Sequence, residues 1–218
     1  MPLPVEPPGG RCPDCRTRRP SFSKARAAGI YAGTARALVR ALKFERREPA
    51  SYPLVDALAA VARREAWDTR ADLVAAVPLH PRKRRERGFN QSDVLAHGIA
   101  RACGLPFLDP LVRTRDTPPQ GAATTLSRER NVEGAFALRG RRGSRSARRV
   151  AGKRVLLVDD VMTSGATLSE CARVLKRAGA LEVFALAAAR GGVPGPRGTP
   201  LEVAPLTRSS GSHRAFRA

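Results

Sequence analysis

The sequence predicts an α/β fold in which strands and helices alternate along the chain and the strands form one parallel sheet. The apolar run at 155–158 shows no helical spacing, which is typical of a buried parallel strand. The segment 166–179 that follows repeats apolar residues at helical spacing and ends at a glycine, and a second apolar run occupies 181–189. A strand, a helix and a strand in this order favour a parallel sheet flanked by helices.

The same alternation is predicted upstream of this unit. Residues 33–47 and the stretch 54–61 each place apolar residues on one helical face. The short apolar run 73–77 is predicted to be the first strand of the core, and 90–103 a helix with Asn90 as its N-cap.

The remaining segments give weaker or irregular signals. Residues 108–113 and 135–138 are weaker strand candidates, and the segment 139–153 is predicted to be a basic loop. Residues 192–218 are rich in Pro, Gly and Ser and show no periodicity, so we expect a disordered tail there.

Composition limits the classes of function. The net charge of +21 among 218 residues predicts attraction to polyanions, either nucleic acid or a polyphosphate substrate. The alternative is that GC-rich coding has placed arginine at solvated positions, and composition does not separate the two. No apolar run approaches the length of a membrane span and no signal peptide is visible, so we expect a cytoplasmic protein. Four unevenly spaced cysteines do not form a disulfide framework.

The most informative stretch is VLLVDDVMTSGATL at 155–168. Its small-residue turn should present backbone N–H groups and hydroxyls to a phosphate at the start of a helix; the turn comprises Thr163, Ser164, Gly165, Ala166 and Thr167. The preceding carboxylates, Asp159 and Asp160, would repel a phosphate, but they suit a ligand that also carries hydroxyls or a metal. A ribose 5-phosphate satisfies both requirements. The pattern is neither a P-loop nor a GxGxxG turn. The alternative is a capped helix preceded by two turn residues.

This stretch resembles the phosphoribosyl pyrophosphate (PRPP) motif of type I phosphoribosyltransferases. Other segments resemble the ComF (competence protein F) branch of proteins with that fold, so that the similarity covers roughly residues 11–191; they are CPDC at 12–15, YAGTARALVRALKF at 31–44, VPLHPRKRRERGFNQSDVLA at 77–96 and TPPQGAATTLSRERNVEGAF at 117–136. The resemblance implies a phosphoribosyltransferase-like domain at 21–191 in which residues 20–70 form a helical hood that selects the nucleophile. It also implies a link to uptake of transforming DNA.

The resemblance assigns two further parts of the site. The turn at Leu79 and His80 would hold the pyrophosphate of PRPP, with Arg84 and Arg87 as contacts. The segment 117–136 would be the mobile loop that closes over PRPP, with Arg128 and Arg130 as candidate catalytic residues beside Asp159 and Asp160. The alternatives are a basic solvated loop and an ordinary solvated helix.

The N-terminal segment 1–20 carries one Cys-x-x-Cys pair, Cys12 and Cys15. The ComF pattern usually includes a zinc ribbon, and a tetrahedral zinc site needs four ligands. This segment is therefore expected to be a flexible leader holding a remnant of the ribbon, that is, half of a Zn²⁺ site.

Together these features predict a protein that binds PRPP with Mg²⁺, which is held through the substrate, and that transfers the phosphoribosyl group to an unidentified nucleophile. The alternative is a non-catalytic accessory that responds to PRPP or binds single-stranded DNA. The resemblance also implies competence proteins as partners and a homodimer, the assembly common in this fold. The sequence leaves open whether turnover occurs.

Overall fold

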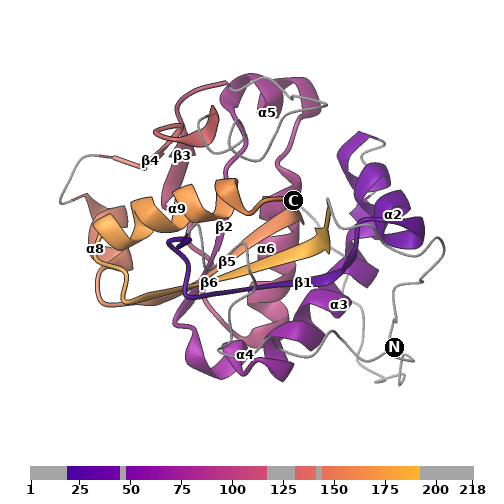
Figure 1. Cartoon of the computed structure of the whole chain (residues 1–218), viewed down its shortest axis with the longest axis horizontal. Helices are drawn as coiled ribbons and strands as arrows, with labels where there is room; N and C mark the ends of the chain where they lie inside the picture. Colours follow the sequence, from indigo (N-terminus) through magenta and orange to yellow (C-terminus); the bar gives the residue numbers. More distant parts are fainter. Residues whose placement is uncertain (1–18, 45–47, 117–130, 141–143, 192–218) are drawn as a thin grey trace.

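The computed structural model describes residues 19–44, 48–116, 131–140 and 144–191. Its centre is a parallel sheet with the strand order β1-β6-β5-β2 (Figure 1). Every neighbouring pair in this sheet is parallel. The strands are β1 (Lys24–Ile30), β2 (Leu73–Ala76), β5 (Arg154–Met162) and β6 (Glu182–Arg190). The predicted α/β class with a parallel sheet is confirmed.

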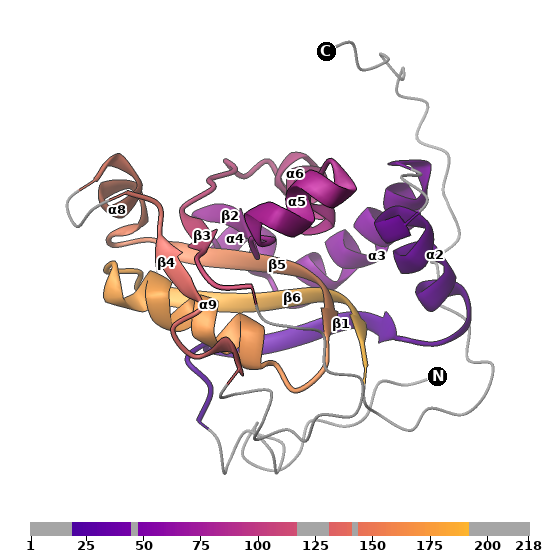
Figure 2. The same ribbon diagram turned by 90° about the horizontal axis from the view of Figure 1, so that it is seen from above.

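Helices cover both faces of the sheet. Helices α3 and α6 lie on one face and α9 on the other (Figure 2). The helices are α2 (Gly33–Phe44), α3 (Ser51–Arg64), α4 (Trp67–Arg70), α5 (Pro81–Arg87), α6 (Gln91–Cys103), α8 (Arg145–Val150) and α9 (Ala166–Arg177), with a 3-10 turn, η1, at Glu48–Ala50. Two short strands, β3 (Leu111–Arg113) and β4 (Phe136–Leu138), form a separate antiparallel pair.

Strand β5 divides the core because its side chains alternate between the two faces. Leu156 and Val158 pack in the cluster that holds α3 and α6, whereas Val155 and Leu157 pack in the cluster that holds α9. All four side chains are fully buried. The continuous apolar run is therefore explained by a strand that is covered on both sides.

Three sequence predictions are wrong in detail. Part of the segment assigned to the hood, 24–30, is the strand β1, which pairs with β6 at the edge of the main sheet. The basic segment that follows the turn at Leu79 and His80 forms helix α5, where a solvated loop was the alternative, and the basic loop predicted at 139–153 contains helix α8. The predicted tail and residues 45–47 of the first predicted helix lie outside the described residues.

The predicted helix at 90–103 is confirmed, together with its cap. The Asn90 side chain accepts a hydrogen bond from the backbone N–H of Ser92 and begins α6. The helix predicted at 166–179 ends two residues early, at Arg177, and Gly179 follows it with φ at 96°. Among the described helices, none is long and apolar enough to cross a membrane.

Candidate functional site

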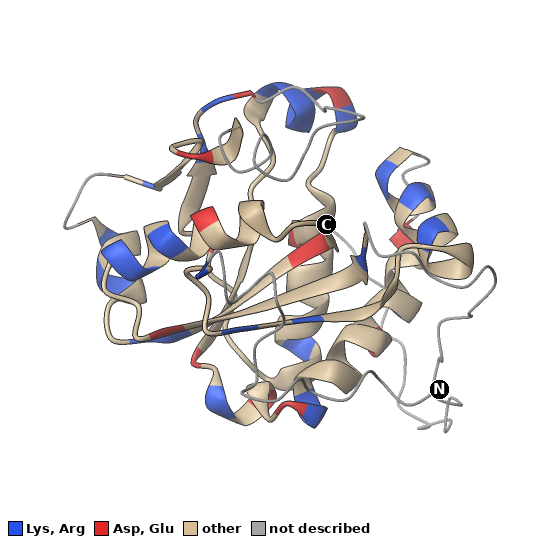
Figure 3. Ribbon diagram, in the orientation of Figure 1, with Lys and Arg blue, Asp and Glu red and all other residues tan. Residues whose placement is uncertain are grey.

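The acidic pair lies within the last part of β5 and not in the turn after it. Strand β5 continues through Asp159 and Asp160 to Met162, which corrects the predicted end of the strand at residue 158. The two residues retain only 8% and 4% of their exposure. Figure 3 shows this acidic end of β5 with the basic helices α2 and α5 around it. Two neighbouring carboxylates buried to this degree are costly unless donors or cations compensate them.

Asp159 is compensated by two hydrogen bonds to one oxygen. Its Oδ1 accepts from the Ser92 hydroxyl at 2.9 Å and from the backbone N–H of Asp160 at 2.9 Å. Burial, together with the neighbouring charge of Asp160, raises the pKa of Asp159 to about 7, although these donors and Lys43 oppose the rise. The raised pKa follows from burial beside a second carboxylate, and a donor or cation bound at the pair would lower it.

Asp160 is compensated by a lysine from another element. The Nζ of Lys43, in the last turn of α2, lies 2.9 Å from Asp160 Oδ1. The other oxygen, Oδ2, is buried and has no hydrogen-bond partner within the part of the chain that the structure describes. One oxygen of Asp160 is thus paired with a cation, and the other is a buried acceptor that no described residue satisfies.

The predicted phosphate turn connects β5 directly to α9. Gly165 has φ at 80° and stands immediately before the helix, a left-handed conformation that favours glycine. The Ser164 hydroxyl accepts from the N–H of Ala166 at 3.4 Å, and Thr163 is exposed. Thr167 lies in the first turn of α9. The strand, turn and helix start therefore have the arrangement that the sequence predicted for an anion site.

The predicted pyrophosphate turn follows β2. Leu79 and His80 are partly buried, and Pro81 begins α5. The His80 ring nitrogen Nδ1 accepts from the N–H of Arg82 at 3.4 Å, so His80 caps this helix. The buried amide of Asn90 donates to the carbonyl of Val77 at 3.0 Å and ties the end of β2 to the start of α6.

The two arginines predicted for pyrophosphate belong to α5 and have protein partners. Arg84 lies 3.8 Å from Asp93 and its side chain is 55% exposed. Arg87 donates to the Gln91 side chain at 3.1 Å, and its guanidinium lies 5.4 Å from the centre of the Phe44 ring. Because Gln91 precedes Ser92, and Phe44 follows Lys43, Arg87 contacts the immediate neighbours of both residues that hold the acidic pair.

Several predicted residues lie outside the described residues. These are the catalytic candidates Arg128 and Arg130 and the cysteines Cys12 and Cys15. In the part of the chain that the structure describes, no three His, Cys, Asp or Glu side chains form a group that could hold a metal ion.

Sequence reasoning missed Ser92 and Lys43. Ser92 enters the sequence analysis only within the segment 77–96, although a hydroxyl in the first turn of a helix that follows a core strand is well placed to reach the carboxyl end of the sheet. Lys43 is one of only five lysines among 40 basic residues. Its contact with Asp160 spans 117 positions (160 − 43), and no local pattern could have indicated it.

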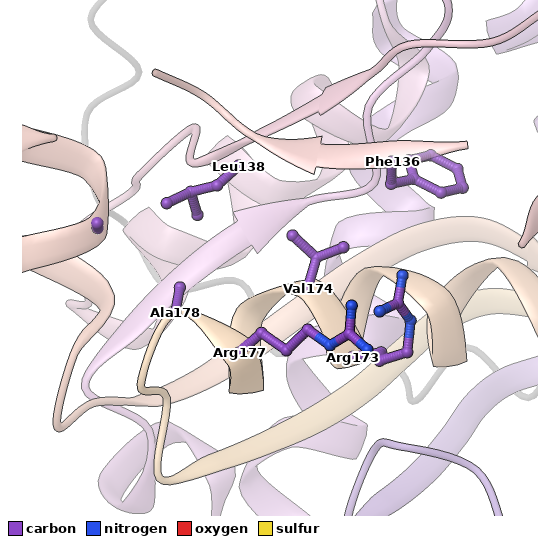
Figure 4. Close-up of a pocket in the computed structure, with 7 residues that line it drawn as sticks. Phe136, Leu138, Arg173, Val174, Arg177 and Ala178 are labelled. Carbon is purple, nitrogen blue, oxygen red and sulfur yellow. The ribbon is translucent and has the colours of Figure 1, made fainter. Parts of the chain in front are cut away.

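A surface pocket of about 640 Å³ lies between β4, α8 and α9 (Figure 4). Its lining includes none of the predicted site residues; it consists of Phe136, Leu138, Ala147, Arg173, Val174, Arg177 and Ala178. Arg173 is already paired with Glu170 at 2.5 Å. The acidic pair and the turn at Gly165, not this pocket, therefore form the candidate site.

Comparison with known families assigns part of the chain to a known domain. Residues 85–198 match the phosphoribosyl transferase domain, a segment that includes Ser92, the acidic pair and the turn before α9. The chain thus carries the domain that defines phosphoribosyltransferases. More particularly, it belongs to the competence protein F family within that class, because curated members of the family are similar to it over most of their length.

Two of these relatives illustrate the similarity. The DNA utilization protein YhgH of Salmonella typhimurium is 32% identical over 185 residues, which cover 83% of this chain and 78% of that protein. Competence protein F of Haemophilus influenzae is 30% identical over 177 residues, which cover 79% of this chain and 75% of that protein.

Solved structures give more distant matches. The glutamine PRPP amidotransferase of B. subtilis aligns with a TM-score of 0.41 and 26% identity, over 64% of this chain and 26% of that one. A hypoxanthine phosphoribosyltransferase from Staphylococcus aureus aligns with a TM-score of 0.41 and 13% identity, over 71% of each chain. The family match and the sheet order, not these alignments, carry the fold assignment.

Proposed function

We propose that this protein binds PRPP at the carboxyl end of β5 and transfers its phosphoribosyl group to an acceptor. The observation that carries the proposal is the buried pair Asp159 and Asp160, shortly before the glycine turn that begins α9, with one oxygen of Asp160 unpaired among the residues that the structure describes. A carboxylate oxygen without a donor is the group that a ribose hydroxyl would satisfy, and the turn supplies the N–H groups for the 5-phosphate.

The donor set is compatible with a magnesium ion held through the substrate. Mg²⁺ commonly binds through substrate phosphates with few protein ligands, so the ion would be held through a substrate whose ribose Asp159 and Asp160 fix. Bound there with PRPP, the ion would neutralise charge on the pyrophosphate. No cage of three or more acidic, histidine or cysteine ligands is needed, and none is found among the described residues.

The residues of the chain would then act on the ribose and on its leaving group. When the bond between C1 and pyrophosphate breaks, positive charge develops on the ribose ring, and the carboxylates of Asp159 and Asp160 stabilise it. Arg84 and Arg87 on α5 would stabilise the negative charge that develops on pyrophosphate. The segment 117–136, which the resemblance implies as the loop that closes over PRPP, lies mostly outside the described residues.

A thermal melt with saturating Mg²⁺ and PRPP tests this proposal. Ligand at about 100 times Kd adds about 2.7 kcal/mol, which is roughly 5–10 °C for a chain of this size. The wild type should show this shift, and the double variant Asp159→Asn, Asp160→Asn should fold but show none. A folded wild type that does not shift would refute PRPP binding. If the wild type does bind PRPP, release of pyrophosphate in the presence of candidate acceptors would distinguish transfer from binding alone.

A second function is favoured by the relatives and by the charge. Proteins similar to this chain are named for DNA utilization and competence, and the chain has a net charge of +21. A basic protein that binds single-stranded DNA and uses PRPP only as a regulatory ligand accommodates both facts. Such an accessory would bind an oligonucleotide with an affinity that falls steeply as salt rises.

The two functions respond differently to loss of the acidic pair. If DNA binding is the main activity, the double Asn variant should retain oligonucleotide affinity and its salt dependence, because Asp159 and Asp160 repel phosphate. If phosphoribosyl transfer is the main activity, the same variant should lose all pyrophosphate release. Fluorescence anisotropy with a labelled oligonucleotide at several salt concentrations measures the first property.

A further inference from the structure

Helix α2 contributes a residue to the candidate site although it lies before the matched domain segment at 85–198. Its side chains Ala35, Val39 and Leu42 are buried, so the helix is firmly packed. Lys43 is the next residue after Leu42, and its Nζ is directed to the Asp160 carboxylate at 2.9 Å. The lysine therefore belongs to a packed helix, and its side chain is not free on the surface.

The contact is enclosed. The Lys43 side chain retains 18% of its exposure and that of Asp160 retains 6%. An ion pair this protected from solvent is screened far less than a surface pair, and removing one partner leaves an uncompensated buried charge. Lys43 thus opposes the repulsion between the adjacent carboxylates and holds Asp160 in one orientation.

That orientation leaves one oxygen for a ligand. Lys43 lies against Oδ1, and the other oxygen, Oδ2, is buried with no hydrogen-bond partner among the described residues. A donor that binds Oδ2 must displace the groups that cover this oxygen, but it need not displace the lysine. A ribose hydroxyl is such a donor and would satisfy the buried oxygen.

We propose that Lys43 is a positioning residue for the ribose of PRPP: it fixes the Asp160 carboxylate so that Oδ2 accepts a ribose hydroxyl. This inference rests on the proposed function and assigns to helix α2 a part in it. Lys43 acts through Asp160 and makes no contact with the phosphates. The affinity for ribose-containing ligands should therefore depend on Lys43, and the affinity for pyrophosphate alone should not.

The test compares Lys43→Gln and Lys43→Arg with wild type by isothermal titration of Mg²⁺-PRPP, ribose 5-phosphate and Mg²⁺-pyrophosphate. We expect Lys43→Gln to weaken PRPP and ribose 5-phosphate about tenfold and to leave pyrophosphate unchanged. Lys43→Arg, which retains the charge, should recover most of the affinity. Lys176→Gln, in the exposed last turn of α9, loses the same charge and should bind like wild type.

Other results overturn the inference. If Lys43→Gln weakens pyrophosphate as much as PRPP, the lysine acts as a general charge; if it tightens PRPP, the lysine competes with the ligand. Equal PRPP affinity in wild type and Lys43→Gln refutes the role of Lys43 but leaves the proposed function standing. A wild type that binds no PRPP refutes both. Thermal melts without ligand show whether each variant is folded. If Lys43→Gln does not fold, the test rests on Lys43→Arg. A folded Lys43→Arg variant that does not bind ribose 5-phosphate then refutes the role.

Discussion

The hydroxyl of Ser92 donates to Oδ1 of Asp159 across 2.9 Å, although the two residues are 67 positions apart. Both residues are buried: Ser92 is 1% exposed and Asp159 is 8% exposed. The contact joins the first turn of α6 to the end of β5. It therefore connects the segment after the predicted pyrophosphate turn with the predicted ribose site.

Replacing Ser92 with alanine should destabilise the protein and weaken PRPP binding. The substitution removes one of the two donors to Asp159 Oδ1, and loss of a buried hydrogen bond to a charged group costs about 1.5–3 kcal/mol. Urea unfolding and PRPP titration measure the two effects. Ser92→Thr retains the hydroxyl and serves as the control; if Ser92→Ala binds PRPP as tightly as wild type, the hydroxyl plays no part in the ribose site.

Asp159 should make stability depend on pH. Its pKa is raised from an ordinary value of 3.8 to about 7. Between pH 3.8 and pH 7, the carboxyl group is therefore protonated in the folded state and ionised in the unfolded state. The free energy of unfolding should therefore fall as pH rises through this window, by up to about 1.4 kcal/mol per pH unit. Asp159→Asn cannot lose a proton at this position. Its free energy of unfolding should increase relative to that of wild type as pH rises from 4 to 7. Urea unfolding at several pH values measures this difference, and a difference that does not change with pH would contradict the prediction.

Gly165→Ala should strain the phosphate turn. A Cβ at this position would meet the Phe22 ring at an ordinary distance of 3.6 Å, so space is not the obstacle. The cost comes from the φ of 80° and should be about 1–2 kcal/mol. Gly104→Ala is a matched control because Gly104 has φ at 66° in open space at the end of α6. Both variants should lose similar stability in thermal melts, and only Gly165→Ala should lose PRPP affinity.

Asn90→Ala should loosen the pyrophosphate turn at its base. The amide caps α6 and donates to the Val77 carbonyl, so its removal leaves the N–H of Ser92 and that carbonyl without these partners. Loss of an N-cap alone costs about 1 kcal/mol, and the buried carbonyl adds to it. Asn90→Asp preserves the cap acceptor, but it sets a buried carboxylate against the Val77 carbonyl and against Asp93, whose oxygen accepts from the amide at 2.9 Å in the wild type. Both variants should therefore unfold at lower urea concentrations than wild type at neutral pH, and equal stability of Asn90→Ala and wild type would show that neither bond matters.

The parts of the fold that could be predicted are those in which local pattern and burial agree. The apolar runs of β5 and β6 and the stripe of α9 each determined one element. Strand β1, KARAAGI, alternates basic residues only with alanines, which have a low strand propensity; it is a strand because β6 offers it a parallel edge. Tertiary pairing outweighed local propensity there.

Helices α5 and α8 were missed for a related reason. Neither shows an apolar stripe, and periodicity is the main helical signal. Residues typical of helix starts are nevertheless present, since Pro81 is the first residue of α5 and the Ser144 side chain caps α8. For the site, the acidic pair and the glycine turn could be predicted because they are contiguous. Ser92 and Lys43 could not, since each reaches the pair only through the fold.

Helix α5 buries none of its seven residues. Its capping contacts are the His80 ring at the start and the left-handed Gly88 at the end, and without an apolar face against the sheet it gains little from packing. Its amide hydrogens should therefore exchange with solvent much faster than those of α6, which carries six buried residues. Arg84 and Arg87 stand on this weakly held turn of helix. A polyphosphate bound to these arginines would slow the amide exchange of α5. Deuterium uptake of this helix would therefore report ligand binding even if uptake in the sheet did not change.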